Sequence, residues 1–251
     1  MKVGLIGAGN MARALARGWA QPVLCSDPIT ERARALAEET GGEALENNAE
    51  VARAADLVVL AHKPQQLQEV AADVAPHAAA VASILAATPL VALRAAYPDC
   101  PVYRFIPSLP VEVRQGAVVQ ARDAVQDPAL DSQVSELFAS LGVLVTLDDA
   151  LVDVAMCLMS CGPAYVALVA EAQVEAGLRY GVPAAEGAEL VVQTLAGTAE
   201  LLRQRSYDTV AVRREVSSPG GMTVRGLDAL ERAGLRAAFS DAMDAVMRSA
   251  R

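Results

Sequence analysis

Short apolar runs alternate with helical patterns through the first half of the 251-residue chain. Between the runs, apolar residues recur every three or four positions, which is the spacing of one buried helix face. Strands and helices in alternation predict a parallel, doubly wound sheet, whose ligand crevice lies beyond the carboxyl ends of its strands. The predicted strands are residues 3–6, 22–26, 57–61, 81–85, 102–106, 117–120 and 143–147.

The second half of the chain shows no strand pattern after Leu147 and is rich in alanine. This change predicts two domains, an α/β domain over residues 1–148 and an all-α domain over residues 149–251. Helices this apolar, in a domain of roughly a hundred residues, bury their faces against a second subunit, so we expect at least a homodimer. The helices are expected to break at residues 162–163, 181–183, 206 and 217–221.

Residues 154–170 form an uncharged run between Asp153 and Glu171. The run contains Gly162 and Pro163 and is shorter than the ~20 residues that usually span a bilayer. A helix buried on most sides is therefore predicted, and no membrane partner.

Gly7, Gly9 and Ala12 follow the first predicted strand directly, in the G-x-G-x-x-A form of the dinucleotide fingerprint. In this motif the first glycine makes the turn and the second lets the backbone approach a pyrophosphate. A helical pattern follows, and a second strand ends at Asp27, about 20 residues after the first glycine. The first domain is therefore predicted to be Rossmann-like and to bind a nicotinamide or flavin dinucleotide.

Asp27 bears on the choice between the two nicotinamide cofactors. A carboxylate at this place accepts a hydrogen bond from a ribose 2′-hydroxyl and repels a 2′-phosphate, so NAD is favoured over NADP. Arg32 and Arg34, close by in the next predicted helix, act in the opposite direction and leave NADP open.

Residues 217–223 read SSPGGMT, and a helical pattern resumes at Val224. Adjacent glycines behind a proline let the backbone turn tightly and expose N–H groups, and a helix start of this kind binds anions. Ser217 and Ser218 are predicted to cap the helix. The segment is interpreted as a cradle for a small carboxylate or phosphate, with an ordinary turn between helices as the alternative.

Charge and cysteine usage exclude several other partners. A net charge of −9 argues against nucleic acid or an anionic membrane surface as partner. Because the first predicted strand begins at once, no room is left for a signal peptide, and a cytoplasmic protein is expected. The cysteines form no CxxC pair and His62 and His77 lie in different segments, so no metal site is predicted.

The order of GAGNMA, a strand followed by KPQ, then CGPAY and SSPGG followed by threonine, resembles the pyrroline-5-carboxylate reductases over the whole chain. The most specific part is residues 217–236. That family reduces the C=N bond of 1-pyrroline-5-carboxylate to proline with NADPH or NADH. The resemblance thus implies NAD or NADP as cofactor, a small cyclic imine carboxylate as substrate, and a homodimer or larger homo-oligomer.

The resemblance also implies roles for single residues. At the pyrophosphate and the adenosine ribose they are Gly7, Gly9, Asn10, Met11, Ser26 and Asp27, with Asn48 as a further cofactor residue. On the nicotinamide side they are Ala61, His62, Lys63, Pro64 and Ala86. At the substrate they are Ser218, Gly220, Gly221, Met222 and Thr223, with backbone N–H groups on the carboxylate and the Thr223 hydroxyl near the ring nitrogen as the catalytic group.

The chain departs from the family pattern at several places. The family commonly has Asn and Thr where this chain has Ser108 and Leu109, and a small residue or Thr where it has Met222. It also has Ser-Gly-Ser at residues 159–161, which read Met-Ser-Cys here, and Val at His62. Bulky Met159 and Met222 leave a related cyclic imine carboxylate open as the substrate, and His62 is either a plain loop residue or an added proton donor.

Two rival functions can be weighed from the residues. Dehydrogenases of the β-hydroxyacid type use a catalytic lysine in the helical half, but the lysines here are Lys2 and Lys63. The other rival is a regulator that binds NAD(P) without catalysis. Pro219, the two glycines and Thr223 argue against it, since a sensor of the dinucleotide alone needs no carboxylate cradle.

Overall fold

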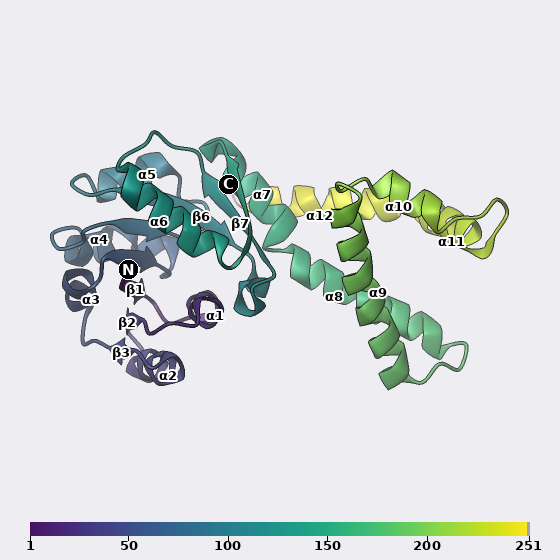
Figure 1. Cartoon of the computed structure of the whole chain (residues 1–251), viewed down its shortest axis with the longest axis horizontal. Coiled ribbons are helices and arrows are strands. Elements are labelled where there is room, and N and C mark those ends of the chain that lie inside the picture. The colour runs from purple at the N-terminus through teal and green to yellow at the C-terminus, as the bar shows by residue number, and fades with distance from the viewer. Residues whose placement is uncertain (250–251) are drawn as a thin grey trace. The chain divides into compact units, whose positions relative to one another are not determined.

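The computed structural model describes residues 1–249, which divide into two compact units, residues 1–163 and residues 164–249. Helices and strands carry the labels shown in Figure 1. The expected domain boundary after residue 148 lies at the start of helix α7 (Asp149–Met159), and this helix belongs to the first unit. It does so because Val152, fully buried, packs among the core residues of the sheet.

An eight-stranded sheet forms the centre of the first unit, with the strand order β3-β2-β1-β4-β5-β6-β7-β8. All the predicted strands are present. The additional strand β3 has two residues and lies at the edge of the sheet, so it carries no apolar run that a pattern could detect. The strands are β1 Val3–Ile6, β2 Leu24–Ser26, β3 Glu43–Ala44, β4 Leu57–Leu60, β5 Val81–Ser83, β6 Val102–Pro107, β7 Gly116–Ala121 and β8 Gly142–Leu147.

One strand pair departs from the predicted parallel sheet, because β7 runs antiparallel to β6, with Phe105 opposite Gln120. The link between them holds only the short 3-10 helix η2 (Leu109–Val113). A parallel return needs a crossover of about a dozen residues or more, so this link forces the reversal. After helix α6 (Pro128–Ala139), β8 pairs with β7 in parallel.

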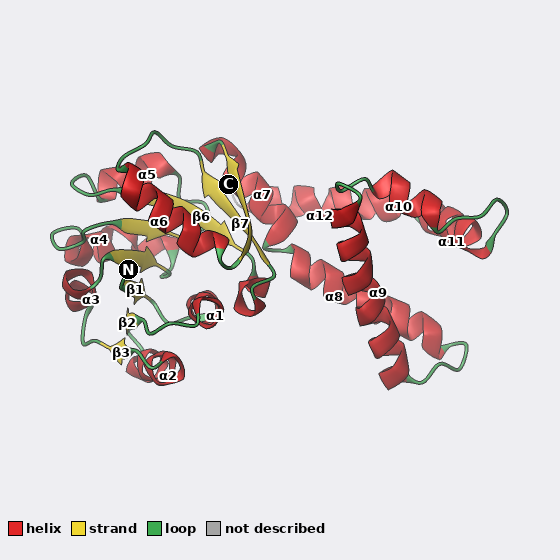
Figure 2. Cartoon of the chain, viewed as in Figure 1, coloured by secondary structure: helices red, strands yellow, loops and turns green. Residues whose placement is uncertain are grey.

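Helices cover both faces of the sheet, as a doubly wound fold requires (Figure 2). On one face Leu15, Leu36 and Phe138 are fully buried, and the rings of Phe105 and Phe138 stack with centroids 3.8 Å apart. The helices of this face are α1 (Asn10–Trp19), α2 (Thr30–Thr40) and α6. Those of the other face are α3 (Asn48–Ala54), α4 (Leu67–Val74), α5 (Leu90–Ala96) and α7.

The second unit is all helical, and the predicted breaks separate its first four helices. A further break, at Gly234 with φ +80°, was not predicted. Among the described residues of this unit, Val212 is the one buried hydrophobic side chain, while Leu168 and Leu190 are each 64% exposed. The helices are α8 (Gly162–Leu178, which begins in the last residues of the first unit), α9 (Ala184–Gln204), α10 (Thr209–Glu215), α11 (Met222–Arg232) and α12 (Leu235–Ser249).

The run Asp149–Leu178 is long and apolar enough to cross a membrane, judged by length and composition alone, and 11% of its most apolar window is buried. The chain bends at residues 160 and 161, between α7 and α8. Helices that face a second subunit have the same composition, so this run is weak evidence for a membrane span.

Candidate functional site

The turn between β1 and α1 has the geometry of a phosphate-binding turn. Gly7 has φ +101°, and a Cβ atom on it would lie 2.8 Å from the carbonyl oxygen of Ala61 at the end of β4. Glycine is therefore required here both by conformation and by close packing. Gly9 differs, because a Cβ atom there would meet nothing within 4 Å. The backbone at Gly9 thus borders open space, in which a ligand can approach it.

Helix α1 begins beside this space. Its N-cap is Gly9, no side chain caps it, and its first turn holds no acidic residue. The first N–H groups of a helix lack partners within the helix and carry its positive end, so Asn10 and Met11 present donors to an anion. The pyrophosphate of a dinucleotide fits this helix start.

The residues predicted for the adenosine ribose meet at the end of β2. Asp27 accepts hydrogen bonds of 2.8 Å from two backbone N–H groups, that of Ala8 on Oδ2 and that of Ile29 on Oδ1. Ser26 donates its hydroxyl to Oδ1 of Asn48, at 2.8 Å. Each carboxylate oxygen keeps a lone pair for a ribose hydroxyl. The structure thus brings Ser26, Asp27 and Asn48 together beside the glycine turn.

Residues 61–64 follow β4 at the same end of the sheet, beyond the carboxyl ends of the parallel strands. There the Ala61 N–H donates to the carbonyl of Ile6. Nδ1 of His62 lies 2.8 Å from the carbonyl oxygen of Lys63, which can only accept, so Nδ1 carries the hydrogen. Burial lowers the pKa of His62 below its ordinary value, and its buried Nε2 has no partner among the described residues. The Nδ1 hydrogen is already bound to the Lys63 carbonyl, and burial disfavours a second proton at Nε2, so this geometry argues against His62 as an added proton donor.

A charged cluster beside the Ala86 loop was missed by the sequence reasoning. Arg104 in β6 has a fully buried side chain that bonds Asp149 and Asp153 of α7, each at 2.7 Å. Both aspartates also accept backbone N–H groups of the loop that follows Ala86. The signal was present, because an arginine inside the apolar run VYRFIP needs a buried acid as its partner.

In the second unit, helix α11 begins at Met222 with Gly221 as its N-cap and without a side-chain cap. The prediction that Ser217 and Ser218 cap this helix is wrong. A turn at Gly220, with φ +69°, comes between, and it is closed by the Gly221 N–H on the Ser218 carbonyl at 2.9 Å. The first-turn donors of α11 therefore remain available to an anion.

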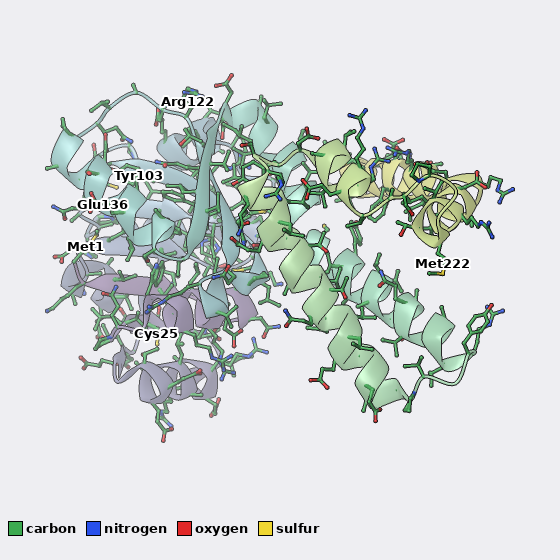
Figure 3. All side chains as sticks on the ribbon, turned by 45° about the vertical axis from the view of Figure 1, so that its right-hand side comes forward. Met1, Cys25, Tyr103, Arg122, Glu136 and Met222 are labelled. Atoms are coloured by element: carbon green, nitrogen blue, oxygen red, sulfur yellow. The ribbon has the colours of Figure 1, made fainter. Side chains whose placement is uncertain are left out.

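Two predicted substrate residues lie at this helix start. Met222 is 90% exposed and its side chain projects into open space, as Figure 3 shows. Thr223 is exposed as well, on the first turn of the helix. The predicted cradle thus consists of backbone N–H groups, with one hydroxyl beside them.

Ser108, Met159 and Ser160, which depart from the family pattern, make contacts within the first unit. Ser108 is 2% exposed, and its hydroxyl oxygen accepts the Ala117 N–H at 2.9 Å. The Ser160 hydroxyl oxygen lies 3.0 Å from the Met159 sulfur and 3.1 Å from the Pro107 carbonyl oxygen, and its one hydrogen can be donated to either. Ser108 therefore serves the β6–β7 connection.

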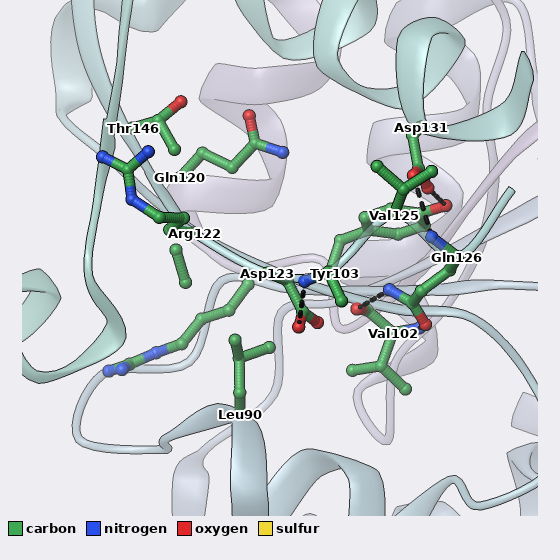
Figure 4. A pocket seen from close by; sticks show the side chains of 13 residues that line it. Leu90, Val102, Tyr103, Gln120, Arg122, Asp123, Val125, Gln126, Asp131 and Thr146 are labelled. Carbon is green, nitrogen blue, oxygen red and sulfur yellow. Dashed lines mark hydrogen bonds between the residues drawn. The ribbon is translucent and has the colours of Figure 1, made fainter. Parts of the chain in front are cut away.

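A cavity of about 250 Å³ lies at the opposite end of the sheet, where β6 begins and β7 ends (Figure 4). None of the predicted site residues lines it. The Tyr103 hydroxyl donates to Asp131 at 2.6 Å, and the Gln126 side chain bonds both the N–H and the carbonyl of Val102. The polar groups named here pair with one another. Residues 1–249 contain no group of three or more His, Cys, Asp or Glu that could hold a metal ion.

Two family models match the chain. Residues 149–251 match pyrroline-5-carboxylate reductase dimerisation, and residues 2–87 match NADP oxidoreductase coenzyme F420-dependent. Pyrroline-5-carboxylate reductase 3 of Macaca fascicularis is 34% identical over 100% of this chain and 95% of its own length.

Solved structures agree with the sequence relatives. The 1-pyrroline-5-carboxylate reductase of Streptococcus pyogenes has a TM-score of 0.89 at 30% identity, covering 100% of this chain and 98% of its own. The Plasmodium falciparum pyrroline carboxylate reductase with NADP bound has a TM-score of 0.88 at 25% identity, covering 100% and 97%. Identity at this level over the full length identifies the family. The chain belongs to the pyrroline-5-carboxylate reductase family.

Proposed function

We propose that this protein reduces the C=N bond of 1-pyrroline-5-carboxylate to give L-proline, with a reduced nicotinamide dinucleotide as co-substrate. The observation that carries the proposal is the presence of two uncapped, glycine-bounded helix starts in one chain, α1 at Gly9 and α11 at Gly221. The first suits a pyrophosphate and the second suits a carboxylate. A reductase of an imine acid needs both.

The residues of each unit have separate tasks in this proposal. The first-turn N–H groups of α11 bind the substrate carboxylate and orient the ring. The Thr223 hydroxyl donates a hydrogen bond to the ring nitrogen and passes it a proton, which is then recovered from water. The dinucleotide supplies the hydride that adds to the imine carbon, so that C=N becomes CH–NH. Gly7, Gly9, Asn10 and Met11 hold the pyrophosphate.

We also propose that NADH is preferred over NADPH. The Asp27 carboxylate is held in place by the N–H groups of Ala8 and Ile29, so it cannot swing away from a ribose bound at the end of β2. A 2′-phosphate there would meet a fixed negative charge.

The family's dimerisation region covers residues 149–251, and the described helices of the second unit leave most of their apolar side chains exposed. A homodimer built through these helices is therefore part of the proposal.

The test is oxidation of NADH and of NADPH, followed spectrophotometrically, with 1-pyrroline-5-carboxylate, pyrroline-2-carboxylate and a six-membered cyclic imine carboxylate. Fastest oxidation with 1-pyrroline-5-carboxylate is the expected result. Oxidation with another imine alone would move the assignment to that substrate. Tight NADH binding without oxidation by any imine would contradict the enzyme and favour a dinucleotide-binding regulator.

A further inference from the structure

Arg104, Asp149 and Asp153 form what we call the β6–α7 charge cluster. The Arg104 side chain is 0% exposed, and its two terminal nitrogens donate to Oδ1 of Asp149 and Oδ1 of Asp153, each at 2.7 Å. A buried guanidinium is tolerated only when carboxylates compensate it. Because Asp149 and Asp153 are one helical turn apart on α7, both face the same strand.

Both carboxylates also bind the loop of residues 86–90. Oδ1 of Asp153 accepts the Ala87 N–H at 3.1 Å, and Oδ2 of Asp149 accepts the Leu90 N–H at 3.0 Å. Within the loop, the Thr88 hydroxyl donates to the Ala86 carbonyl at 3.0 Å. The loop is thus tied to α7 at two points, and through α7 to the buried arginine.

The backbone of this loop is strained at Ala87, which has φ +52°. Residues other than glycine hold left-handed conformations only where the surroundings impose them, and such positions concentrate at functional sites. The Asp153 carboxylate accepts the N–H of Ala87 itself, and this hydrogen bond stabilises the conformation.

The loop begins at the end of the sheet that carries the proposed dinucleotide site. Ser83, the last residue of β5, pairs with Leu60 of β4, which pairs with Ile6 of β1. The loop after β5 therefore follows the glycine turn and residues 61–64 along this end, on the side away from Asp27. A dinucleotide with its adenosine at Asp27 extends its other half toward this loop.

We propose that the β6–α7 charge cluster is a positioning device for the cofactor, which holds the 86–90 loop in the strained shape that receives the nicotinamide half. This inference rests on the proposed function, in that a dinucleotide binds this end of the sheet. Asp149 and Asp153 belong to residues 149–251, so the region matched to dimerisation supplies the groups that shape the cofactor site.

The test compares binding of NADH with binding of adenosine diphosphate, which carries the adenosine half and both phosphates but no nicotinamide. Calorimetry on the full chain measures both without any imine. Asp153→Ala is expected to lower the affinity for NADH about tenfold, because a charge-assisted hydrogen bond to the loop is lost. The affinity for adenosine diphosphate is expected to stay unchanged. Adding Ala87→Gly to that variant is expected to restore at least part of the affinity, because glycine adopts a positive φ without help.

Asp131→Ala is the matched control, since Asp131 also accepts one side-chain and one backbone donor, but from Tyr103 and Gln126 and not from the 86–90 loop. It should lower the melting temperature and leave NADH binding unchanged. If Asp153→Ala does not fold, Asp153→Asn is measured in the same way.

Three outcomes would show that the cluster has a purely structural role and would overturn the inference. They are an equal loss of affinity for NADH and adenosine diphosphate in Asp153→Ala, no recovery of NADH affinity on adding Ala87→Gly, and the same loss of NADH affinity in Asp131→Ala. A wild-type protein that binds neither NADH nor NADPH would overturn the cofactor site itself, and with it this inference. A protein that binds NADH but reduces no imine would contradict only the proposed reaction. The comparison of NADH and adenosine diphosphate binding would still decide the role of the cluster.

Discussion

The backbone N–H of Ala8 donates a 2.8 Å hydrogen bond to Oδ2 of Asp27, so the acid that ends β2 also holds the glycine turn that ends β1. Its other oxygen accepts the Ile29 N–H at the same distance. Asp27 therefore has two tasks at once. It shapes the turn that we propose receives the pyrophosphate, and in the same proposal it places a negative charge where a 2′-phosphate would lie.

Asp27→Asn removes the charge, while its single amide oxygen can still accept the Ala8 N–H that holds the turn; the Ile29 N–H then loses its partner. We expect the ratio of kcat/KM with NADPH to that with NADH to rise by roughly tenfold or more. Steady-state kinetics with both cofactors measures it. Asp56→Asn is the control, since Asp56 accepts the Lys2 N–H at the far end of the sheet. A wild-type enzyme that already prefers NADPH would show the charge argument to be wrong.

Alanine substitutions of the two glycines in the turn should affect different properties, cofactor affinity for Gly9 and stability for Gly7. Gly9→Ala adds a methyl group where nothing lies within 4 Å, so the melting temperature should be unchanged while NADH affinity falls about tenfold or more. Gly7→Ala forces φ +101° on alanine and drives Cβ to 2.8 Å from the Ala61 carbonyl, so unfolding should become easier by ~1–2 kcal/mol or more. Thermal melts and cofactor titrations separate the two.

Gly41→Ala is the control for conformation alone, because Gly41 has φ +66° and open space around its Cβ position. It should lower stability without affecting cofactor affinity. If Gly9→Ala bound NADH as tightly as the wild type, the phosphate-binding role of this turn would be refuted.

Thr223→Ala should lower kcat by about 100-fold, the usual scale for losing a positioned proton donor. NADH affinity should stay at the wild-type value, because the cofactor residues lie on other elements. Thr223→Ser keeps the hydroxyl and should retain most of the activity. Thr194→Ala removes a hydroxyl that donates to the Leu190 carbonyl within α9, and it is the control. Equal loss of turnover and of cofactor binding in Thr223→Ala would count against the assignment.

A structural feature could be predicted from the sequence when the residues that specify it lie within one segment of the chain. Strand β4 was predictable because all four of its residues are buried, so its sequence is a continuous apolar run. Such a run does not indicate the direction of the strand. The antiparallel direction of β7 results instead from the short link at residues 108–115. The glycine turn and Asp27 were predictable as contiguous motifs with a known spacing.

The charge cluster could not be assembled from local patterns, because Arg104, Asp149 and the N–H of Ala87 come from three separate segments. The cap of α11 was mispredicted for the opposite reason, since a local rule was applied without its geometry. Serines cap a helix only when they stand directly before it, and here the turn at Gly220 intervenes.

His62 should make stability depend on pH in the acid range. Burial lowers its pKa below the ordinary value, so the folded state binds this proton more weakly than the unfolded state does. Its contribution is complete above the unfolded pKa of about 6.5 and is lost as the pH falls through the folded pKa. His62→Val should therefore lose less unfolding free energy between about pH 7.5 and pH 5.5 than the wild type.

Urea unfolding at several pH values measures this difference. His77→Val, which changes the exposed histidine beside Arg53, is the matched control. If His62→Val lost stability toward acid as steeply as the wild type, the His62 ring would not be the group responsible.

The exposed apolar faces of the second unit should be contact surfaces between copies of this chain. Leu168 on α8 and Leu190 on α9 are each 64% exposed, although burying a leucine gains ~1.5–3 kcal/mol. In a twofold dimer each position counts twice, so Leu190→Glu or Leu168→Glu should weaken dimerisation by about 100-fold or more. Light scattering after size exclusion should show a monomer, whereas Leu190→Met should stay dimeric. Wild-type mass in both glutamate variants would place the interface elsewhere.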